Sequence, residues 1–168
     1  EHTHSVLAVS QYSKYWEGGW SGDVQISHGW KHYDDEYLGT SPSSQSLTTQ
    51  NSYGALSISR DTEKYYGYLS AGISNIGVNL NGDRQHYLHP VLYYGGNYLL
   101  NEKSSVSLNG EFTYTEFSPS NKNSVVVPVS FFESVVGNPN IKPIKVMTNR
   151  LSYNTSVKGL NLSGTYLS

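Results

Sequence analysis

The chain lacks the residues that mark several common protein classes. It contains no cysteine, which excludes disulfide scaffolds, thiolate metal sites and thiol nucleophiles. Charged residues make up only 14% of its 168 residues, and the formal net charge of −2 comes without any cluster of lysine or arginine. Nucleic-acid binding therefore has no electrostatic basis. No apolar run approaches the roughly 20 residues that a membrane helix needs.

What the chain does have is a repeated alternation of apolar residues with small uncharged polar ones, together with 15 tyrosines. A side-chain period of two is typical of β-strands. In the clearest example, one face would carry Val106, Leu108, Phe112 and Tyr114, and the other would carry Ser107, Asn109, Glu111 and Thr113.

Turn signals divide the chain, taken as one domain over 1–168, into eight predicted strands. The polar breaks include a Ser/Thr/Gln run over 39–51, the Asn81-Gly82-Asp83 turn within 77–84, and 118–123. An even number of antiparallel strands predicts an all-β, eight-stranded up-and-down β-barrel over 23–168. The predicted strands are 23–33, 53–60, 65–73, 89–100, 105–117, 124–136, 144–153 and 159–167.

Residues 5–20 allow two interpretations. As a short amphipathic helix, which is the interpretation we favour, the segment ends at Gly18-Gly19 and gathers on one side Ala8, Val9, Tyr12, Tyr15 and Trp16. As a strand, the alternating residues are Val6, Ala8, Tyr12 and Trp16. That alternative adds a ninth strand and implies a fragment of a larger barrel.

The composition of the two faces predicts which one meets lipid. A water-facing surface usually carries Lys, Glu and Asp, whereas the polar positions here are Ser, Asn and Thr, which suit a narrow interior. The apolar face would then contact hydrocarbon, and the barrel would be transmembrane. A soluble lipocalin-like barrel or a sandwich is the alternative. The predicted lipid-facing residues are Leu56, Ile58, Leu92, Tyr94, Leu108, Phe112, Leu160 and Leu162.

Several local patterns occur in an order that resembles one family, the outer-membrane lipid A palmitoyltransferases. They are Tyr33-Asp34-Asp35-Glu36, Gly54-Ala-Leu-Ser-Ile-Ser-Arg60, Gly67-Tyr-Leu-Ser-Ala-Gly72 and the proline-containing run over 127–137. The resemblance covers most of the chain. It implies a short N-terminal amphipathic helix before eight strands.

The resemblance also implies an activity, the transfer of an acyl chain from a phospholipid to lipid A. The family's histidine corresponds to His28, six residues before Asp34, and its Asp-Ser pair falls at Ser74-Asn75, where no carboxylate is present. We therefore expect His28 and Ser74 as catalytic residues, with no cofactor and no metal. The expected setting is the bacterial outer membrane, reached through a cleaved signal peptide, with phospholipid and lipid A as partners of a monomer.

Acyl transfer needs a base for the attacking hydroxyl and donors for the oxyanion. Beyond His28, His32, His86 and His89 are candidate bases, and Ser27 is a second candidate hydroxyl. The carboxylates that could orient a base are Asp34, Asp35 and Asp83. A metal site at His86 and His89, or at His2 and His4, has too few ligands to close.

Glu111 is the acid that the pattern places inside the barrel. We expect it to pair with a base such as Lys145 or with interior water, because an unpaired buried charge is costly.

The sequence is compatible with three functions. One is the lipid A acyltransferase, and another is a non-catalytic outer-membrane barrel whose loops bind surface or envelope partners. The third is a segment of a larger export pore or a soluble lipid-carrying barrel.

Overall fold

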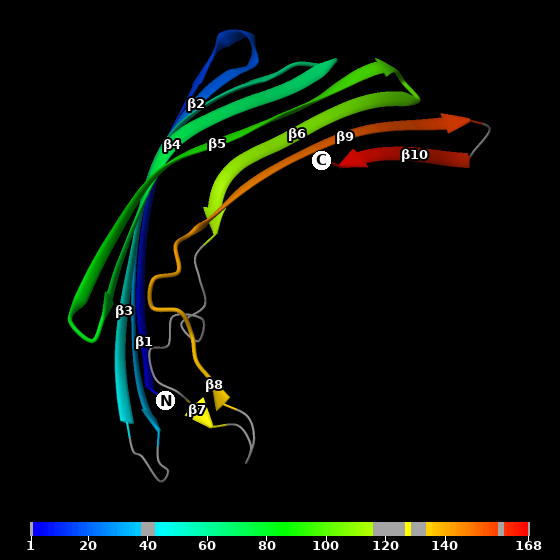
Figure 1. The fold of residues 1–168 in the computed structure, drawn as a ribbon. Coiled ribbons are helices and arrows are strands. Elements are labelled where there is room, and N and C mark those ends of the chain that lie inside the picture. Colours follow the sequence, from blue (N-terminus) through cyan, green and yellow to red (C-terminus); the bar gives the residue numbers. More distant parts are fainter. Residues whose placement is uncertain (1, 38–42, 116–126, 129–133, 158–159, 168) are drawn as a thin grey trace.

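The computed structural model is all-β and describes residues 2–37, 43–115, 127–128, 134–157 and 160–167 (Figure 1). Eight strands form one sheet in the order β1-β2-β3-β4-β5-β6-β9-β10, each antiparallel to its neighbour. No helix in these ranges is long and apolar enough to cross a bilayer. The strands are β1 (His2–Trp16), β2 (Trp20–Tyr37), β3 (Ser43–Asp61), β4 (Tyr65–Leu80), β5 (Asp83–Asn101), β6 (Ser104–Thr115), β9 (Ile144–Val157) and β10 (Leu160–Leu167).

The sheet is an open arch. Strands β1 and β10 lie at its two edges, and within the described residues neither pairs with a second neighbour (Figure 1). The prediction of eight antiparallel up-and-down strands is therefore confirmed, whereas closure into a barrel is not seen. We call the end with the connections at 17–19, 62–64 and 102–103 the turn end, and the opposite end, with the turn at 81–82, the loop end.

The predicted helix over 5–20 is wrong, because this segment is strand β1. All of His2–Trp16 pairs in continuous antiparallel register with residues 20–34 of β2. Gly18 and Gly19 have positive φ values of 75° and 78° and reverse the chain within the three-residue 3-10 turn η1 (Glu17–Gly19). They complete a hairpin and do not terminate a helix, and the cross-strand ladder decides the conformation of the residues before them.

Within the predicted strand over 124–136, the described residues 127–128 and 134–135 do not belong to the main sheet. They are β7 (Val127–Pro128) and β8 (Ser134–Val135), which pair with each other in a separate two-stranded sheet. The rest of the prediction, 124–126 and 129–133, lies outside the described residues. The polar breaks at 39–51 and 77–84 are also shorter than predicted, because β3 begins at Ser43 and β4 continues to Leu80. Ladder pairing with neighbours keeps these polar residues extended.

The two faces of the sheet differ as the alternation predicts. The buried side chains of the described residues all lie on one face, which we call the inner face; they are Leu47, Ala55, Ile76, Val78, Leu80, Val91, Gln45 and Ser70. On the outer face, Leu56, Ile58 and Leu108 are exposed, together with Leu69 and Ile73. The residues predicted for the apolar face therefore lie on the outer face, in every case where the side chain is described. The side chains of Leu160 and Leu162 lie outside that description.

Aromatic rings cover glycines on neighbouring strands and hold the sheet in register. Tyr94 of β5 pairs directly with Gly110 of β6, and a Cβ on Gly110 would clash with the Tyr94 ring. The Tyr94 hydroxyl donates a hydrogen bond to the Asn149 amide oxygen one strand further on. Tyr68 covers Gly95 of β5 in the same way. Each ring fills the space that the missing side chain leaves, which adds cross-strand contact area.

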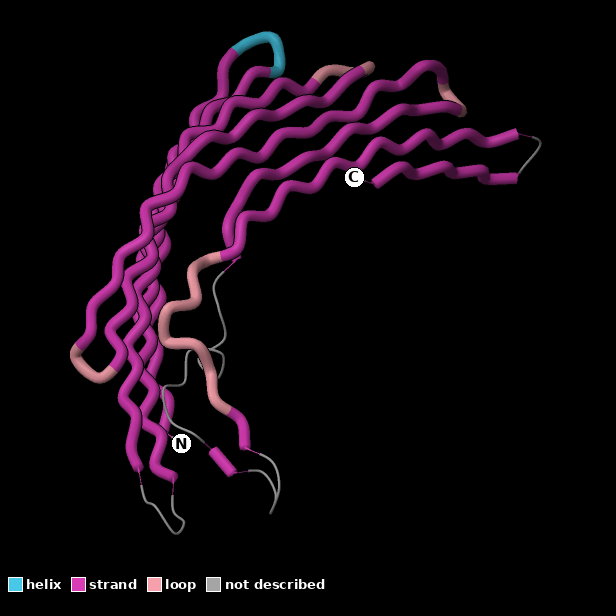
Figure 2. Tube along the Cα trace, in the orientation of Figure 1, coloured by secondary structure: helices cyan, strands magenta, loops and turns pink. Residues whose placement is uncertain are grey.

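The Asn81-Gly82 turn joins β4 to β5 and is confirmed at the predicted place (Figure 2). Both residues have positive φ, 51° and 95°, as a two-residue hairpin turn of type I′ requires. The turn is tied to β3, because the Ser46 N–H donates to Asn81 Oδ1 at 2.8 Å and the Asn81 N–H donates to the Ser46 carbonyl at 2.9 Å.

We predict that Gly82→Ala lowers the free energy of unfolding by about 1 kcal/mol, because an L side chain is strained at this φ. The matched control is Gly54→Ala in β3, since an added Cβ meets nothing within 4 Å at either glycine and only Gly82 has a positive φ. Urea unfolding followed by circular dichroism measures both. Equal effects at the two positions would contradict the assignment of the cost to backbone strain.

Candidate functional site

The inner face forms a polar groove across the middle of β2–β6. One hollow of about 630 Å³ has hydroxyl, amide and phenol groups as most of its lining. Hydrogen bonds link neighbouring strands inside it, including Ser57 to Ser70 at 2.8 Å and Ser74 to the Asn51 side chain at 3.3 Å. No charged side chain is among its lining residues: Gln25, Ser27, Asn51, Tyr53, Ser57, Tyr68, Ser70, Ser74, Val91, Tyr93, Thr113 and Tyr114.

A second hollow of about 650 Å³ shares Tyr68 and Tyr93 with the first and continues the groove toward β9. This part is charged, because Glu111 and Arg150 both line it. Glu111 accepts a hydrogen bond from Thr148 at 2.8 Å, directly across the β6–β9 pairing. The groove on the inner face therefore has one acid and one base at its β9 side.

The predicted pairing of Glu111 with Lys145 is wrong. Lys145 pairs with Tyr114 in the ladder, whereas Glu111 pairs with Thr148, so the two side chains occupy alternate positions of opposite parity. The Lys145 ammonium group lies 4.9 Å from the centre of the Phe112 ring, a cation–π contact on the outer face. A single-residue difference in strand position reverses the face, so these two charges lie on opposite sides of the sheet.

The inner face changes character toward the loop end. Leu47, Ile76, Val78 and Leu80 form a buried apolar cluster, against which Tyr33 and Tyr87 pack. Burial raises the pKa of the Tyr87 phenol, and the charge of Asp83 adds to the increase. The phenol therefore stays protonated at neutral pH and donates a hydrogen bond to Gln85 Oε1 at 2.7 Å.

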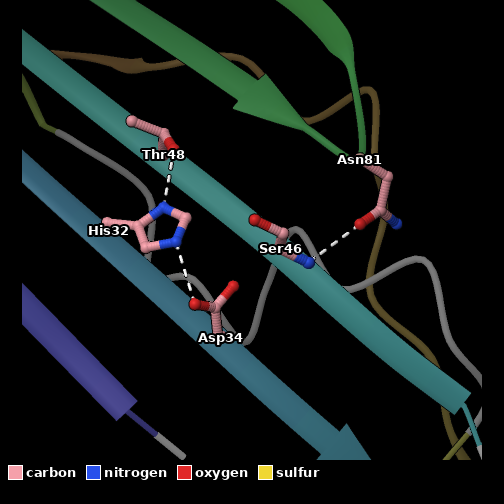
Figure 3. A network of polar contacts seen from close by, with 5 residues as sticks. All are labelled: His32, Asp34, Ser46, Thr48 and Asn81. Carbon is pink, nitrogen blue, oxygen red and sulfur yellow. Dashed lines mark hydrogen bonds and ion pairs between the residues drawn. The ribbon is translucent and has the colours of Figure 1, made fainter.

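A hydroxyl, an imidazole and a carboxylate form a chain on the outer face (Figure 3). His32 Nδ1 lies 2.8 Å from Thr48 Oγ1, and His32 Nε2 lies 2.9 Å from Asp34 Oδ2. The Trp30 ring stacks on the imidazole at a centroid distance of 5.7 Å. The connectivity is that of a nucleophile, a base and an orienting acid. Cross-strand polar pairs of the same kind also occur on sheet surfaces with no chemical role, where they contribute about 0.2–1 kcal/mol.

The structure does not bring the two predicted catalytic residues together. His28 is on the outer face of β2, where its Nδ1 lies 2.8 Å from Ser52 Oγ. Ser74 is on the inner face of β4 and pairs in the ladder with Tyr53 and His89. Because the backbone of the sheet separates them, His28 cannot take a proton from Ser74 directly.

The remaining predicted candidates are scattered. His86 is on the outer face of β5, opposite Gly77. His89 is stacked between Tyr87 and Tyr114, with ring centroids 6.2 Å and 3.9 Å away, and its buried Nε2 has no hydrogen-bond partner among the described residues. The side chain of Asp35 lies outside the description. Within the described part of the chain, no group of three or more His, Cys, Asp or Glu side chains could hold a metal ion.

No family model, curated protein or solved structure matches this chain. The resemblance to the lipid A palmitoyltransferases therefore remains a prediction from local patterns.

Sequence reasoning did not find the groove tyrosines or Thr48 as members of a site. Tyr53, Tyr68 and Tyr93 occupy the same alternate positions as the polar residues of their strands. The alternation alone therefore indicates that they line the groove face. Thr48 carries no such signal, because its contact with His32 depends on the register between β2 and β3.

Proposed function

We propose that this chain forms part of the wall of a bacterial outer-membrane β-barrel with more than eight strands, whose inner face lines a passage for polar solutes. The observation that supports this best is the division of the two faces near the turn end. Exposed Leu56, Ile58 and Leu69 lie on the outer face, and the hydroxyl- and amide-lined groove lies on the inner face. Outer-membrane barrels have this arrangement of apolar outside and polar inside.

The open edges support a larger barrel. Eight strands close a barrel only if the sheet turns through a full circle, and this sheet leaves β1 and β10 apart (Figure 1). Unpaired backbone N–H and C=O groups at a lipid-exposed edge are too costly to persist in hydrocarbon. A sheet with its outer face in lipid therefore needs further strands against β1 and β10. More strands also widen the interior until it holds water.

We predict that the protein conducts ions in planar bilayers and that Glu111→Gln lowers its preference for cations. A unit charge about 8 Å from a passing ion in water contributes about 0.5 kcal/mol, which corresponds to about a twofold change in the permeability ratio. Lys145→Gln is the control, because it removes a charge from the outer face. Absence of conductance, or an equal effect of the two variants, would contradict the proposed passage.

The size of the barrel has its own test, which the absence of native cysteine makes simple. Single cysteines at Gln11 or Tyr12 of β1 are each combined with one at Thr165 or Tyr166 of β10, and an oxidant is added to the protein in membranes. We expect no β1–β10 disulfide in any combination, because further strands separate these edges. A pair at Ser57 and Ser70, which face each other in the β3–β4 ladder, should cross-link and serves as the positive control. Efficient β1–β10 cross-linking would indicate a closed eight-stranded barrel.

A second candidate function is the acyl transfer that the family resemblance implies. The observation that favours it is the chain of Thr48, His32 and Asp34 on the outer face, where a lipid headgroup could reach it. Against it, β3 pairs on both sides at Thr48, so its backbone N–H groups are used in the ladder. An oxyanion would have to be held by side chains alone. For this reason we rank the passage first.

Acyl transfer predicts that lipid A from cells making the protein is heavier by one acyl chain. His32→Ala and Thr48→Val should each abolish the increase, because they remove the base and the hydroxyl. His86→Ala on the same face is the matched control and should leave the increase unchanged. Mass spectrometry of extracted lipid A measures all four proteins, and an unmodified mass with the wild-type protein rules this candidate out.

A further inference from the structure

The alternation of β4 reverses its phase halfway along the strand. Toward the turn end, Leu69 and Ile73 are on the outer face and are 48% and 54% exposed. Toward the loop end, the apolar residues are Ile76, Val78 and Leu80, which are on the inner face and only 3–6% exposed. Over the same stretch, the outer face carries Asn75 and Asn79. The apolar side of the strand has therefore changed from outer to inner.

No irregularity of the backbone causes this reversal. The β3–β4 ladder runs without a register shift from Leu47–Leu80 to Asp61–Tyr66, and the β4–β5 ladder is continuous from Leu80–Asp83 to Tyr65–Tyr98. A β-bulge would move later side chains to the other face, and none is present in these pairings. Each face is therefore formed by the same alternate positions along the whole strand. What changes along β4 is which face carries the apolar residues.

On the neighbouring strands, the outer face changes from apolar to polar at the same level. On the turn-end side, the outer rows of β2 and β3 carry Val24, Ile26, Leu56 and Ile58, which we call the outer apolar band together with Leu69, Ala71 and Ile73 of β4. On the loop-end side, the outer rows across β2–β5 are mainly polar. The outer polar zone is His28, His32, Thr48, Gln50, Ser52, Asn75, Asn79, Arg84 and His86.

Apolar exceptions lie next to the boundary. Leu88 shares the row of His28, and Trp30 lies in the row after it. At the turn end, Trp16, Trp20 and Tyr98 are exposed on the outer face. Aromatic residues at both borders of an apolar band are typical of the two interfaces of a membrane.

The strands are longer than a membrane requires. A tilted strand crosses the hydrocarbon with about 9–11 residues, whereas β3 has 19 residues and β5 has 19. In β3, residues 53–61 lie on the turn-end side of Ser52 and carry the outer apolar band, and this length is about the minimum that the crossing needs. The remaining residues of β3 form the loop-end half, where outer polar groups and the inner buried cluster reproduce the amphipathicity of a sheet in water.

We infer that lipid contacts the outer face only over the turn-end half of β2–β5, and that the loop-end half projects from the membrane into water with an apolar core on its inner face. This inference rests on the proposed membrane barrel. The boundary lies between the row of Ile26, Gly54 and Ile73 and the row of His28, Ser52 and Asn75. The partner of the outer apolar band is therefore the acyl-chain region of the bilayer, and that of the outer polar zone is water.

Site-directed fluorescence tests the position of this boundary. Single cysteines replace Leu56 and Ala71 in the outer apolar band, or Gln50 and Asn79 in the outer polar zone, in a chain without native cysteine. Each variant of the full protein is labelled with a bimane and reconstituted into vesicles that contain a lipid with a nitroxide on its acyl chain. Leu56, Ala71 and Gln50 are exposed, and Asn79 is half-exposed, so these changes leave the buried cluster intact. Circular dichroism of each variant checks that strand content is retained.

We expect quenching at Leu56→Cys and Ala71→Cys to be several times that at Gln50→Cys and Asn79→Cys. Strong quenching at all four positions would overturn the boundary and leave the membrane barrel standing. Background quenching at all four would overturn the membrane barrel itself, and the boundary with it. Quenching confined to Gln50→Cys and Asn79→Cys would overturn the boundary by placing the opposite half in lipid.

Discussion

The uninterrupted antiparallel ladder is the constraint on which this molecule depends. From β1 to β5 each strand pairs with the next along its length, so every side chain is assigned to one of two faces by its position alone. A shift of one residue in any pairing would exchange the faces of the strands beyond it. The glycines under Tyr68 and Tyr94, and the Asn81-Gly82 turn bonded to Ser46, each oppose such a shift.

The ladder also explains why the polar groups lie where they do. The groove of hydroxyl, amide and phenol groups exists because serines and tyrosines on the same parity of neighbouring strands are brought into line. The same pairing also separates two residues that the predicted acyl-transfer mechanism needs side by side. His28 and Ser74 belong to different faces, whereas His32 and Thr48 meet because their strands pair them directly. Two side chains on a sheet can act together only if they lie on the same face and in the same row or in adjacent rows.

Part of the fold was predictable because it depends on local pattern. Alternation identified the inner and outer sides of β3, β5 and β6, and the Asn-Gly pair identified the turn after β4. The failures occurred where pairing overrides local preference. Residues 5–20 support either a helix or a strand, and the ladder with β2 decided in favour of the strand. The expected pairing of Glu111 with Lys145 failed because the β6–β9 register, which brings Glu111 opposite Thr148, is a relation between distant segments.

By itself, the sequence determined that this protein is built from antiparallel strands with one apolar and one small-polar side, because a period of two is a property of each strand alone. Only the tertiary structure decided that the eight strands form an open arch, that β7 and β8 pair in a sheet of their own, and that His32 contacts Thr48. These outcomes depend on register and curvature, which arise from the sum of contacts between segments far apart in the chain. No single strand contains that information.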